Sequence, residues 1–406
     1  MKADLHIRVE FTNVGCCTLK NNNMFLQDER DAFFVADMGD MVRKHLRWHE
    51  ALPRVAPFFA VKYNNKPAVI RTLACLGTGF DCISKNEIDM VLQIGVNPQR
   101  IIFGNPCKKP SHIKHAAAHG VDTMVFDCED ELEKVARLHP AARYAHVFLH
   151  SFSHVLPLCV LEIHLKLLDI GGGFHGRFNG VETFEEVASK VNEALDKNFP
   201  KGSSIHLIAE PGRYYVQSAI TLAANVITKK SETTDDKCSF MYFVNNGIYS
   251  SFHVVMYNRS TVIQPLSLKG ENEVTLESIV WGHTCAGGDC VVKNCSLPEL
   301  STGDWLIFKN MGAYSMTAWS TFNGFSSPEC EFVMAQKDWS VFPIFFCVTF
   351  YSSSLSHRFS LTKSKIRNSI GWSGLLLSPP PKVDGGYVFT RLPVNKISQK
   401  VVDKFG

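Results

Sequence analysis

Three short stretches, AVKYN at residues 60–64, DIGGGF at 169–174 and AEPGRYY at 209–215, decide the fold that we expect for this chain. Each stretch begins with apolar residues that fit the end of a buried strand, and it finishes in residues that do chemistry where the strand exits. Chemistry at the carboxyl ends of parallel strands is typical of β/α barrels and doubly wound sheets. We therefore expect the three stretches to form one site on such a fold.

The first two stretches supply an amine and a glycine triplet. Lys62 offers an amine that can hold a carbonyl cofactor as a Schiff base. The triplet Gly171, Gly172 and Gly173 lets backbone N–H groups approach a phosphate. Read in isolation, Lys62 is as well explained by a surface or salt-bridged lysine, and the glycines by a turn between a strand and a helix.

The third stretch adds a carboxylate and a cation. Glu210, Gly212 and Arg213 give a negative charge, a second point of close approach and a planar cationic fork. Pairing of Glu210 with Arg213 is an alternative that the sequence leaves open. An aldehyde cofactor with a phosphate and a basic ring nitrogen needs this set of residues, and pyridoxal phosphate is such a molecule.

The bulk properties describe an ordinary globular chain. Its 406 residues suffice for about two domains, and hydrophobic residues make up 45% and charged residues 20%. The net charge of +3 is too small to indicate nucleic-acid binding. The 13 cysteines lack a paired C-x-x-C metal spacing, so we predict no metal site and reduced thiols in a cytoplasmic protein. No apolar run reaches the length of a membrane span.

A repeating strand–helix rhythm predicts an α/β domain. The predicted strands are 58–63, 79–83, 100–104, 123–127, 165–170 and 206–210. The predicted helices are 29–51, 68–76, 85–94, 111–118, 129–139 and 183–198. Residues 142–150 are a candidate for a further strand.

Short strands predict an all-β domain after residue 220. They are 223–228, 240–245, 253–257, 273–281, 304–309 and 332–335, and the polar stretch 229–237 reads as a surface loop. The predicted organisation is an N-terminal strand segment joining the β domain (1–28), a barrel (29–220), a β-sandwich (221–341) and a tail without regular structure (342–406).

The motifs AVKYN, TGFDCISKNE, NPCK, LDIGGGF, AEPGRYY, WGHTC and NMGAY together resemble the eukaryotic ornithine decarboxylase family, which includes the antizyme inhibitors. The resemblance runs from about residue 31 to 335. It implies a pyridoxal-phosphate-binding β/α barrel followed by a β-sandwich, and a homodimer with shared active sites.

The resemblance also implies roles for individual residues. Lys62 is the Schiff-base lysine, and Asp81 supports it. Gly173, Gly212, Arg213 and Tyr314 hold the phosphate, and Glu210 pairs with the ring nitrogen. Cys285 enters from the partner subunit and manages protonation. From the residues themselves, Asp81 also fits a turn acid, Cys285 a buried thiol and Tyr314 a core aromatic.

Residues 128–170 depart from the family because they are too few for its two strand–helix units. One such unit takes about 30 residues or more. We therefore expect a barrel that lacks about one to two units and that either leaves open edges or closes under strain. The family's sixth strand, which supplies a ring-stacking histidine, is missing; His154 resembles that histidine only superficially.

The substrate positions depart as well. The resemblance places Tyr257, Asn258, Ala286 and Phe322 near the substrate. Asn258 and Ala286 stand where acids face the distal amine of ornithine. Because an unpaired buried cation costs several kcal/mol, we expect poor binding of ornithine and better binding of an apolar amino acid such as leucine.

The basic segment 108–115 corresponds to the family's antizyme-docking region. Lys108 and Lys114 match that region, and the alternative is a solvated helix face. Two functions therefore remain: a pyridoxal-phosphate-dependent amino-acid decarboxylase, and a non-catalytic regulator that binds antizyme. A shortened chain that does not fold stably is a third possibility.

Overall fold

The computed structural model describes residues 9–11, 17–19, 31–147, 166–176, 182–234, 237–257, 265–267, 274–335 and 338. Residues 29–332 form one compact unit, and the remaining residues form a second. In the second unit, β1 (Val9–Phe11) pairs antiparallel with β2 (Cys17–Leu19). The expectations for His154, for Asn258 and for the whole tail (342–406) lie outside the described residues.

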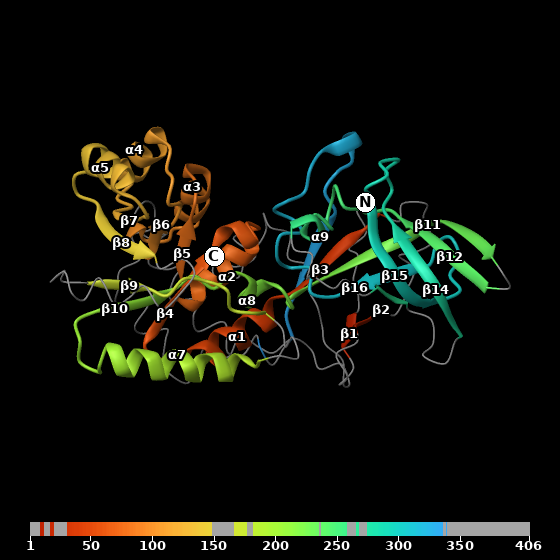
Figure 1. Cartoon of the computed structure of the whole chain (residues 1–406), viewed down its shortest axis with the longest axis horizontal. Coiled ribbons are helices and arrows are strands. Elements are labelled where there is room, and N and C mark those ends of the chain that lie inside the picture. The colour runs from red at the N-terminus through yellow and green to blue at the C-terminus, as the bar shows by residue number, and fades with distance from the viewer. Residues whose placement is uncertain are drawn as a thin grey trace, which may run out of the picture. The chain divides into compact units, whose positions relative to one another are not determined.

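Within the described residues, seven parallel strands close into a barrel (Figure 1). They are, in order around the barrel, β4 (Val55–Ala60), β5 (Gly79–Cys82), β6 (Ile101–Phe103), β7 (Thr123–Phe126), β8 (Arg143–Val147), β9 (Leu167–Asp169) and β10 (His206–Ala209). The last strand pairs again with the first, through Leu207 and Val55. The shortened barrel predicted from the sequence is confirmed, and it closes rather than leaving an open edge.

The ring closes at the place where the family has its sixth strand. Here β8 pairs directly with β9, with Val147 opposite Asp169. The strand predicted at residues 142–150 is therefore real, and it borders the strand that leads into the glycine triplet. As a result, the ends of β9 and β10 still lie beside the end of β4.

Helices follow most barrel strands, and Figure 1 shows α3, α4 and α5 beside β5–β8. The helices of this domain are α1 (Met38–Ala51), α2 (Pro67–Leu76), α3 (Lys85–Gln93), α4 (Pro110–Ala118), α5 (Glu129–Leu138), α7 (Phe184–Asn198) and α8 (Arg213–Val216), with 3₁₀ turns η1 (Val61–Tyr63) and η2 (Pro98–Arg100). Local signals fix their ends. Pro67 starts α2 and the left-handed Gly77 stops it, and a capping box between Thr183 and Glu186 starts α7.

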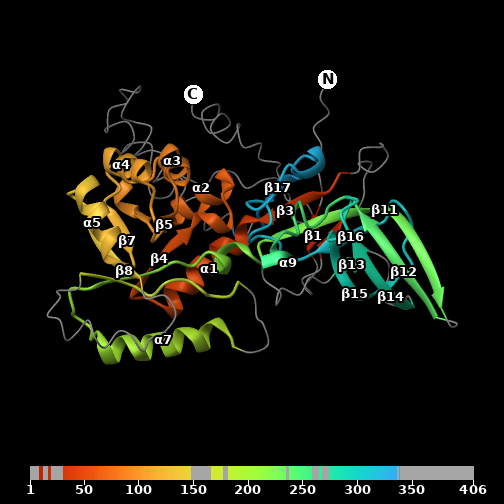
Figure 2. The same cartoon turned by 45° about the horizontal axis from the view of Figure 1, so that its top comes forward.

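The second part of this unit is a mostly antiparallel sheet, as predicted (Figure 2). Its strands are β3 (Phe33–Asp37), β11 (Ile220–Thr234), β12 (Lys237–Val244), β13 (Pro265–Ser267), β14 (Thr275–Trp281), β15 (Cys290–Pro298), β16 (Trp305–Phe308) and β17 (Glu329–Val333), with the short helix α9 (Val254–Tyr257) and the 3₁₀ turn η4 (Phe322–Gly324). The pairing of β12 with β14 is parallel.

The prediction of one helix over residues 29–51 is wrong at its beginning. Phe33–Asp37 is a strand that pairs antiparallel with β11, and the helix begins at Met38. The Asp37 carboxylate caps that helix by accepting from the Gly39 N–H. The apolar residues before Asp37 fit a buried strand and a helix equally well, and only the pairing with β11 decides between them.

Two further predictions are wrong in the β domain. Residues 229–234 of the predicted surface loop are instead part of β11, which continues through Thr234 and pairs with β12. Lys229 and Lys230 place their amines over the rings of Phe240 and Phe243, so polar side chains here cover aromatic ones. Residues 254–257 form the short helix α9 instead of a strand.

In the described part of the chain, no helix is both long enough and apolar enough to cross a membrane.

Candidate active site

The predicted cofactor lysine lies at the end of the first barrel strand. Lys62 is in η1, directly after β4, and its Nζ is 3.6 Å from Oδ2 of Asp81. Asp81 is on β5, where it pairs in register with Ala60. The lysine side chain is 36% exposed and the aspartate 1% exposed. The geometry therefore pairs an accessible amine with a fully buried carboxylate.

Two more carboxylates join this pair. Asp169 ends β9 and Glu210 follows β10, and the Glu210 N–H donates to the carbonyl of Gly171 at 2.8 Å. Asp81 and Glu210 both lie close to Gly104, where an added Cβ would be 2.0 Å from Asp81 Oδ1 and 3.3 Å from Glu210 Oε1. Three strand ends thus bring three acids beside Lys62.

These acids are poorly satisfied by the protein itself. Among the described residues, both Asp81 oxygens, Oδ2 of Asp169 and Oε1 of Glu210 are buried without a hydrogen-bond partner of good geometry. Asp81 faces Lys62 at 3.6 Å, and the Asp169 and Glu210 side chains interact with each other. The other Asp169 oxygen accepts from the Gly171 N–H at 2.8 Å. Buried polar atoms are normally paired, so this cluster is arranged for a group that the chain does not supply.

Burial and mutual repulsion shift the pKa values of the three acids upward. Burial raises the pKa of Asp81, and it raises the pKa of Asp169 to about 6. The pKa of Glu210 rises to about 10, first through burial and then through the negative charges of Asp81 and Asp169. Glu210 is therefore neutral at pH 7 in the free protein.

The pKa of Lys62 is also shifted upward, which favours its charged form. Burial lowers the pKa of Lys62, but the negative charge of Asp81 and, at high pH where Glu210 is ionised, that of Glu210 outweigh this effect. Lys62 is thus an ammonium ion in the free protein. A reaction that needs its neutral amine first has to remove a proton from it.

The glycines serve the site in two different ways. Gly171 and Gly173 have left-handed backbones, with φ of 72° and 93°, and no atom lies within 4 Å of where their Cβ would be. At Gly212, an added Cβ would be 1.8 Å from the ring of Tyr63. Gly171 and Gly173 therefore leave open space, whereas an added Cβ at Gly172 would be 3.0 Å from the Glu210 carbonyl oxygen and Gly212 is needed for contact with an aromatic ring.

Arg213, next to Gly212, lies beside a pair of packed aromatic rings. Its guanidinium carbon is 5.9 Å from the Tyr63 ring centre and 5.6 Å from that of Tyr314. The N–H of Tyr314 donates to the carbonyl of Tyr63 at 3.1 Å, and the two rings are 4.5 Å apart. The NMGAY loop thus reaches the barrel, as the resemblance implied, and brings Tyr314 to Arg213.

A phosphorylated aldehyde with a basic ring nitrogen fits these residues. Glu210, which is neutral in the free protein, can give its proton to a basic ring nitrogen and then accept a hydrogen bond from it, and the amine of Lys62 can take up the aldehyde. The open space beside the left-handed glycines and the cation of Arg213 suit a phosphate.

The roles predicted for the substrate residues and for Cys285 stay predictions. Cys285 is exposed and Ala286 half-buried, both in the turn between β14 and β15, and neither makes a hydrogen bond or ion pair with Lys62. Phe322 is 42% exposed and stacks near Tyr249. The backbone of Tyr257 belongs to α9, and its side chain is outside the described part.

The basic segment 108–115 suggested that Lys108 lies on an exposed face, but it does not. Its side chain is buried and its Nζ is 3.0 Å from Oε1 of Glu131, while the Lys108 N–H donates to the same oxygen at 3.1 Å. The ammonium also donates to the carbonyl of Val125. Lys114, on α4, is exposed. Of the two lysines, only Lys114 is open to a partner.

We expect Glu131→Gln to destabilise the protein by about 2 kcal/mol, because the Lys108 ammonium stays buried while its charged acceptor is lost. The measurement is the midpoint of thermal or urea unfolding. Glu133→Gln, an exposed change on the same helix α5, is the control and should leave the midpoint unchanged. Equal midpoints for the two variants would contradict a stabilising role for the buried pair.

Asp169 and Tyr63 are site residues that the sequence reasoning did not single out. Each lies inside a quoted motif, next to the residue that received the role. The available signal was position: Asp169 is the last residue of β9, as Glu210 is the first residue after β10. Polar residues at the carboxyl end of a barrel strand are candidates for the site wherever they occur.

Comparisons with known proteins agree with this geometry. The sequence model of the pyridoxal-dependent decarboxylase, pyridoxal binding domain, matches residues 38–156 and 157–217. Ornithine decarboxylase of Rattus norvegicus is 41% identical over 409 residues, covering 83% of this chain and 88% of that protein. Antizyme inhibitor 2 of Xenopus laevis is 42% identical over 385 residues, covering 78% and 84%.

Solved structures give the same result. The arginine decarboxylase of Paramecium bursaria Chlorella virus superposes with a TM-score of 0.69 at 27% identity, covering 75% of this chain and 96% of that one. The lysine/ornithine decarboxylase of Vibrio vulnificus, complexed with cadaverine, gives 0.67 at 26% identity, covering 75% and 95%. The chain therefore belongs to the family of ornithine decarboxylases and antizyme inhibitors, whose decarboxylases use pyridoxal phosphate as cofactor.

Proposed function

We propose that this chain is a pyridoxal-phosphate-dependent decarboxylase of a small amino acid. The observation that carries the proposal is the group of Lys62, Asp81, Asp169 and Glu210 at the strand ends of a closed barrel. A chain used only as a scaffold has no need of an accessible lysine beside three buried acids with unpaired oxygens. These four residues lie together although the barrel lacks the strand that the resemblance implies between β8 and β9.

We assign the following roles, which the geometry supports. Lys62 would hold the cofactor through its aldehyde, and in the free protein Asp81, 3.6 Å away, pairs with the Lys62 ammonium. Glu210 holds a proton at the ring nitrogen. Arg213 and Tyr314, with the glycine triplet, bind the phosphate. Bound there, pyridoxal phosphate supplies an electron sink for the pair of electrons left when carbon dioxide departs.

The decisive experiment is to incubate the purified chain with pyridoxal phosphate and a panel of amino acids, and to measure released carbon dioxide. Activity in the chain and none in Lys62→Ala supports the proposal. A folded chain that takes up the cofactor, yet releases no carbon dioxide from any amino acid in the panel, would contradict it.

The substrate that we propose is an apolar amino acid such as leucine rather than ornithine. Ala286 offers only a methyl group at the position where the family resemblance places an acid. We expect Ala286→Asp to raise the ratio of kcat/KM for ornithine to that for leucine by about tenfold or more, because a carboxylate offsets burial of the distal ammonium. Ala286→Ser, similar in size but uncharged, is the control. An unchanged ratio in Ala286→Asp would contradict this assignment.

Binding of antizyme is the second candidate function. The antizyme inhibitors among the relatives and the exposed Lys114 on α4 favour it. Lys114→Glu should weaken capture of the chain by purified antizyme, whereas Lys62→Ala should leave capture unchanged. Capture that is indifferent to Lys114→Glu would remove this residue from the proposed docking face.

We also propose that the protein works in the cytoplasm as a homodimer, with Cys285 of each chain serving the partner's site. Its exposed position in the turn between β14 and β15 supports that role. Within the described residues, the cysteines are free thiols, as expected of a reducing compartment. Sedimentation with and without pyridoxal phosphate tests dimerisation.

A further inference from the structure

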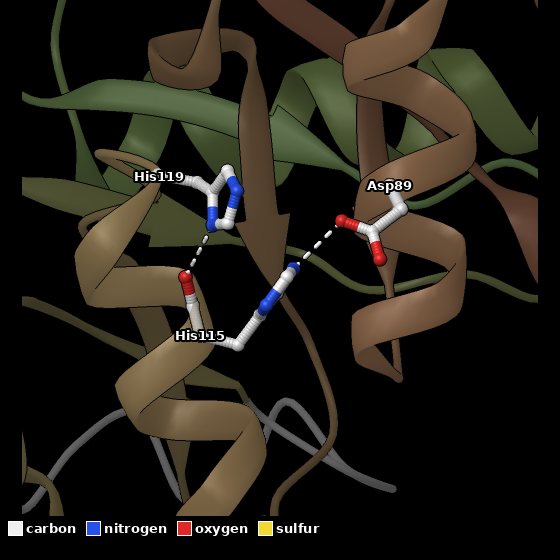
Figure 3. Close-up of side chains that lie close together, drawn as sticks. All are labelled: Asp89, His115 and His119. Carbon is white, nitrogen blue, oxygen red and sulfur yellow. Dashed lines mark hydrogen bonds and ion pairs between the residues drawn. The ribbon is translucent and has the colours of Figure 1, made fainter.

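Two histidines and an aspartate lie close together at helices α3 and α4. None of them belongs to the strand-end cluster, that is, to Lys62, Asp81, Asp169 and Glu210. Asp89 belongs to α3, and His115 and His119 belong to α4 or its end. One ligand atom from each of the three lies within 4.8 Å of the other two. Figure 3 shows the Asp89 carboxylate directed across to the His115 ring, with the His119 ring beside it.

We propose that Asp89, His115 and His119 form a binding site for a divalent transition metal of the Zn²⁺ class, which ties α3 to α4. Neither the family comparison nor the strand-end cluster assigns a role to these residues. The site is independent of the proposed decarboxylase function.

The spacing of the ligands suits such an ion. Residues four apart on a helix present their side chains on one face, so His115 and His119 can reach a common point. Zinc takes imidazole nitrogens and carboxylate oxygens at about 2.0–2.2 Å, which puts two tetrahedral ligands ~3.3 Å apart. Nε2 of His115 is 2.7 Å from Oδ1 of Asp89. To bind zinc, the distance between His115 Nε2 and Asp89 Oδ1 must increase slightly, and the His119 ring must move towards both atoms.

The side chains are free to make that adjustment. Asp89 and His115 are 38% and 23% exposed, and His119 is exposed at the end of its helix. Three protein ligands leave one position for water, as in zinc sites that are open to solvent.

A second contact orients one ligand. Nδ1 of His119 donates to the backbone carbonyl of His115 at 2.8 Å. This hydrogen bond places the proton on Nδ1 and leaves the lone pair of Nε2 available. Histidines that bind metals usually donate their other ring N–H to a carbonyl or carboxylate in this way.

The ligand set also selects the class of metal. Two imidazoles and one carboxylate suit Zn²⁺, Co²⁺, Ni²⁺ or Cu²⁺, whereas Ca²⁺ and Mg²⁺ require oxygen ligands. None of the three ligands is a thiolate. A metal bound here therefore differs spectroscopically from one bound by any of the 13 cysteines.

The test uses the full chain, stripped with chelator and titrated with Co²⁺ and then with Zn²⁺. We expect visible d–d absorption from Co²⁺ without a thiolate charge-transfer band, and its displacement by Zn²⁺. His115→Ala, His119→Ala and Asp89→Asn should each weaken the binding by about tenfold or more, as even outer partners of a metal site do when lost.

The control is His112→Ala, because His112 lies on the same helix but outside the cluster. It should bind Co²⁺ and Zn²⁺ as the unmodified chain does. Circular dichroism of the variants shows whether α3 and α4 stay folded. Binding that is equal in the unmodified chain and in folded His115→Ala and His119→Ala, or absent from the unmodified chain, would overturn the proposal.

Discussion

Replacement of Lys62 by arginine is expected to abolish decarboxylation, with a loss of at least about 10²–10⁴-fold, the range associated with a single positioned catalytic group. A guanidinium keeps the positive charge beside Asp81 but cannot attach an aldehyde. The fold and the buried carboxylate are therefore preserved while the covalent role is removed. Carbon dioxide release and the visible absorbance of bound pyridoxal phosphate are the two measurements.

Lys62→Ala gives the complementary result. It removes both the covalent role and the only cation within 4 Å of Asp81 in the described structure, so it should lose activity and some stability. Lys66→Ala, a change at the N-terminal cap of α2, is the matched control and should keep the absorbance. Retention of the cofactor band and of activity in Lys62→Arg would refute the assignment of Lys62.

Replacement of Glu210 by glutamine is expected to have opposite effects on stability and on activity. The pKa of Glu210 rises from its ordinary value of 4.5 to about 10 in the folded protein, chiefly through burial. Between those values, the folded chain binds a proton that the unfolded chain has released. The free energy of unfolding therefore falls as the pH rises from about 4.5 towards 10.

Glutamine is neutral at every pH, so the free energy of unfolding of the Glu210→Gln protein does not fall in this way as the pH rises. At pH 7 we expect Glu210→Gln to stabilise the cofactor-free protein by on the order of 3 kcal/mol, at about 1.36 kcal/mol for each pKa unit. The melting temperature should rise by roughly 5 °C. At pH 4.5 the difference should nearly vanish, so melting curves across this range measure it.

Activity should move the other way in the same variant. A glutamine cannot hold the ring nitrogen protonated by charge, so we expect turnover to fall by about 10²–10³-fold, as when a preorganised electrostatic partner is lost. Glu193→Gln, an exposed change on α7, should alter neither property. A Glu210→Gln protein that is no more stable at pH 7 than at pH 4.5, relative to the parent, would contradict the raised pKa.

Most of the barrel and of the predicted cofactor site was accessible from the sequence. Strand ends at Lys62 and Glu210 were predicted because an apolar run followed by a polar residue is a local pattern, whereas Asp81 was singled out only by the family resemblance. Capping signals such as Pro67 and Gly77 are equally local. The strand at Phe33–Asp37 was misassigned because its pairing partner, β11, is almost 190 residues away in the chain.

The sequence by itself determined which residues end the strands and which chemistry they carry. Tertiary structure alone decided that the shortened barrel closes, because closure depends on whether β8 can pair with β9 across a missing strand. It also decided that Lys108 is buried against Glu131, and that Asp89 meets His115 and His119. These contacts join separate elements, a loop to α5 and α3 to α4. The relative position of such elements is set by packing on the barrel and not by any local pattern in the chain.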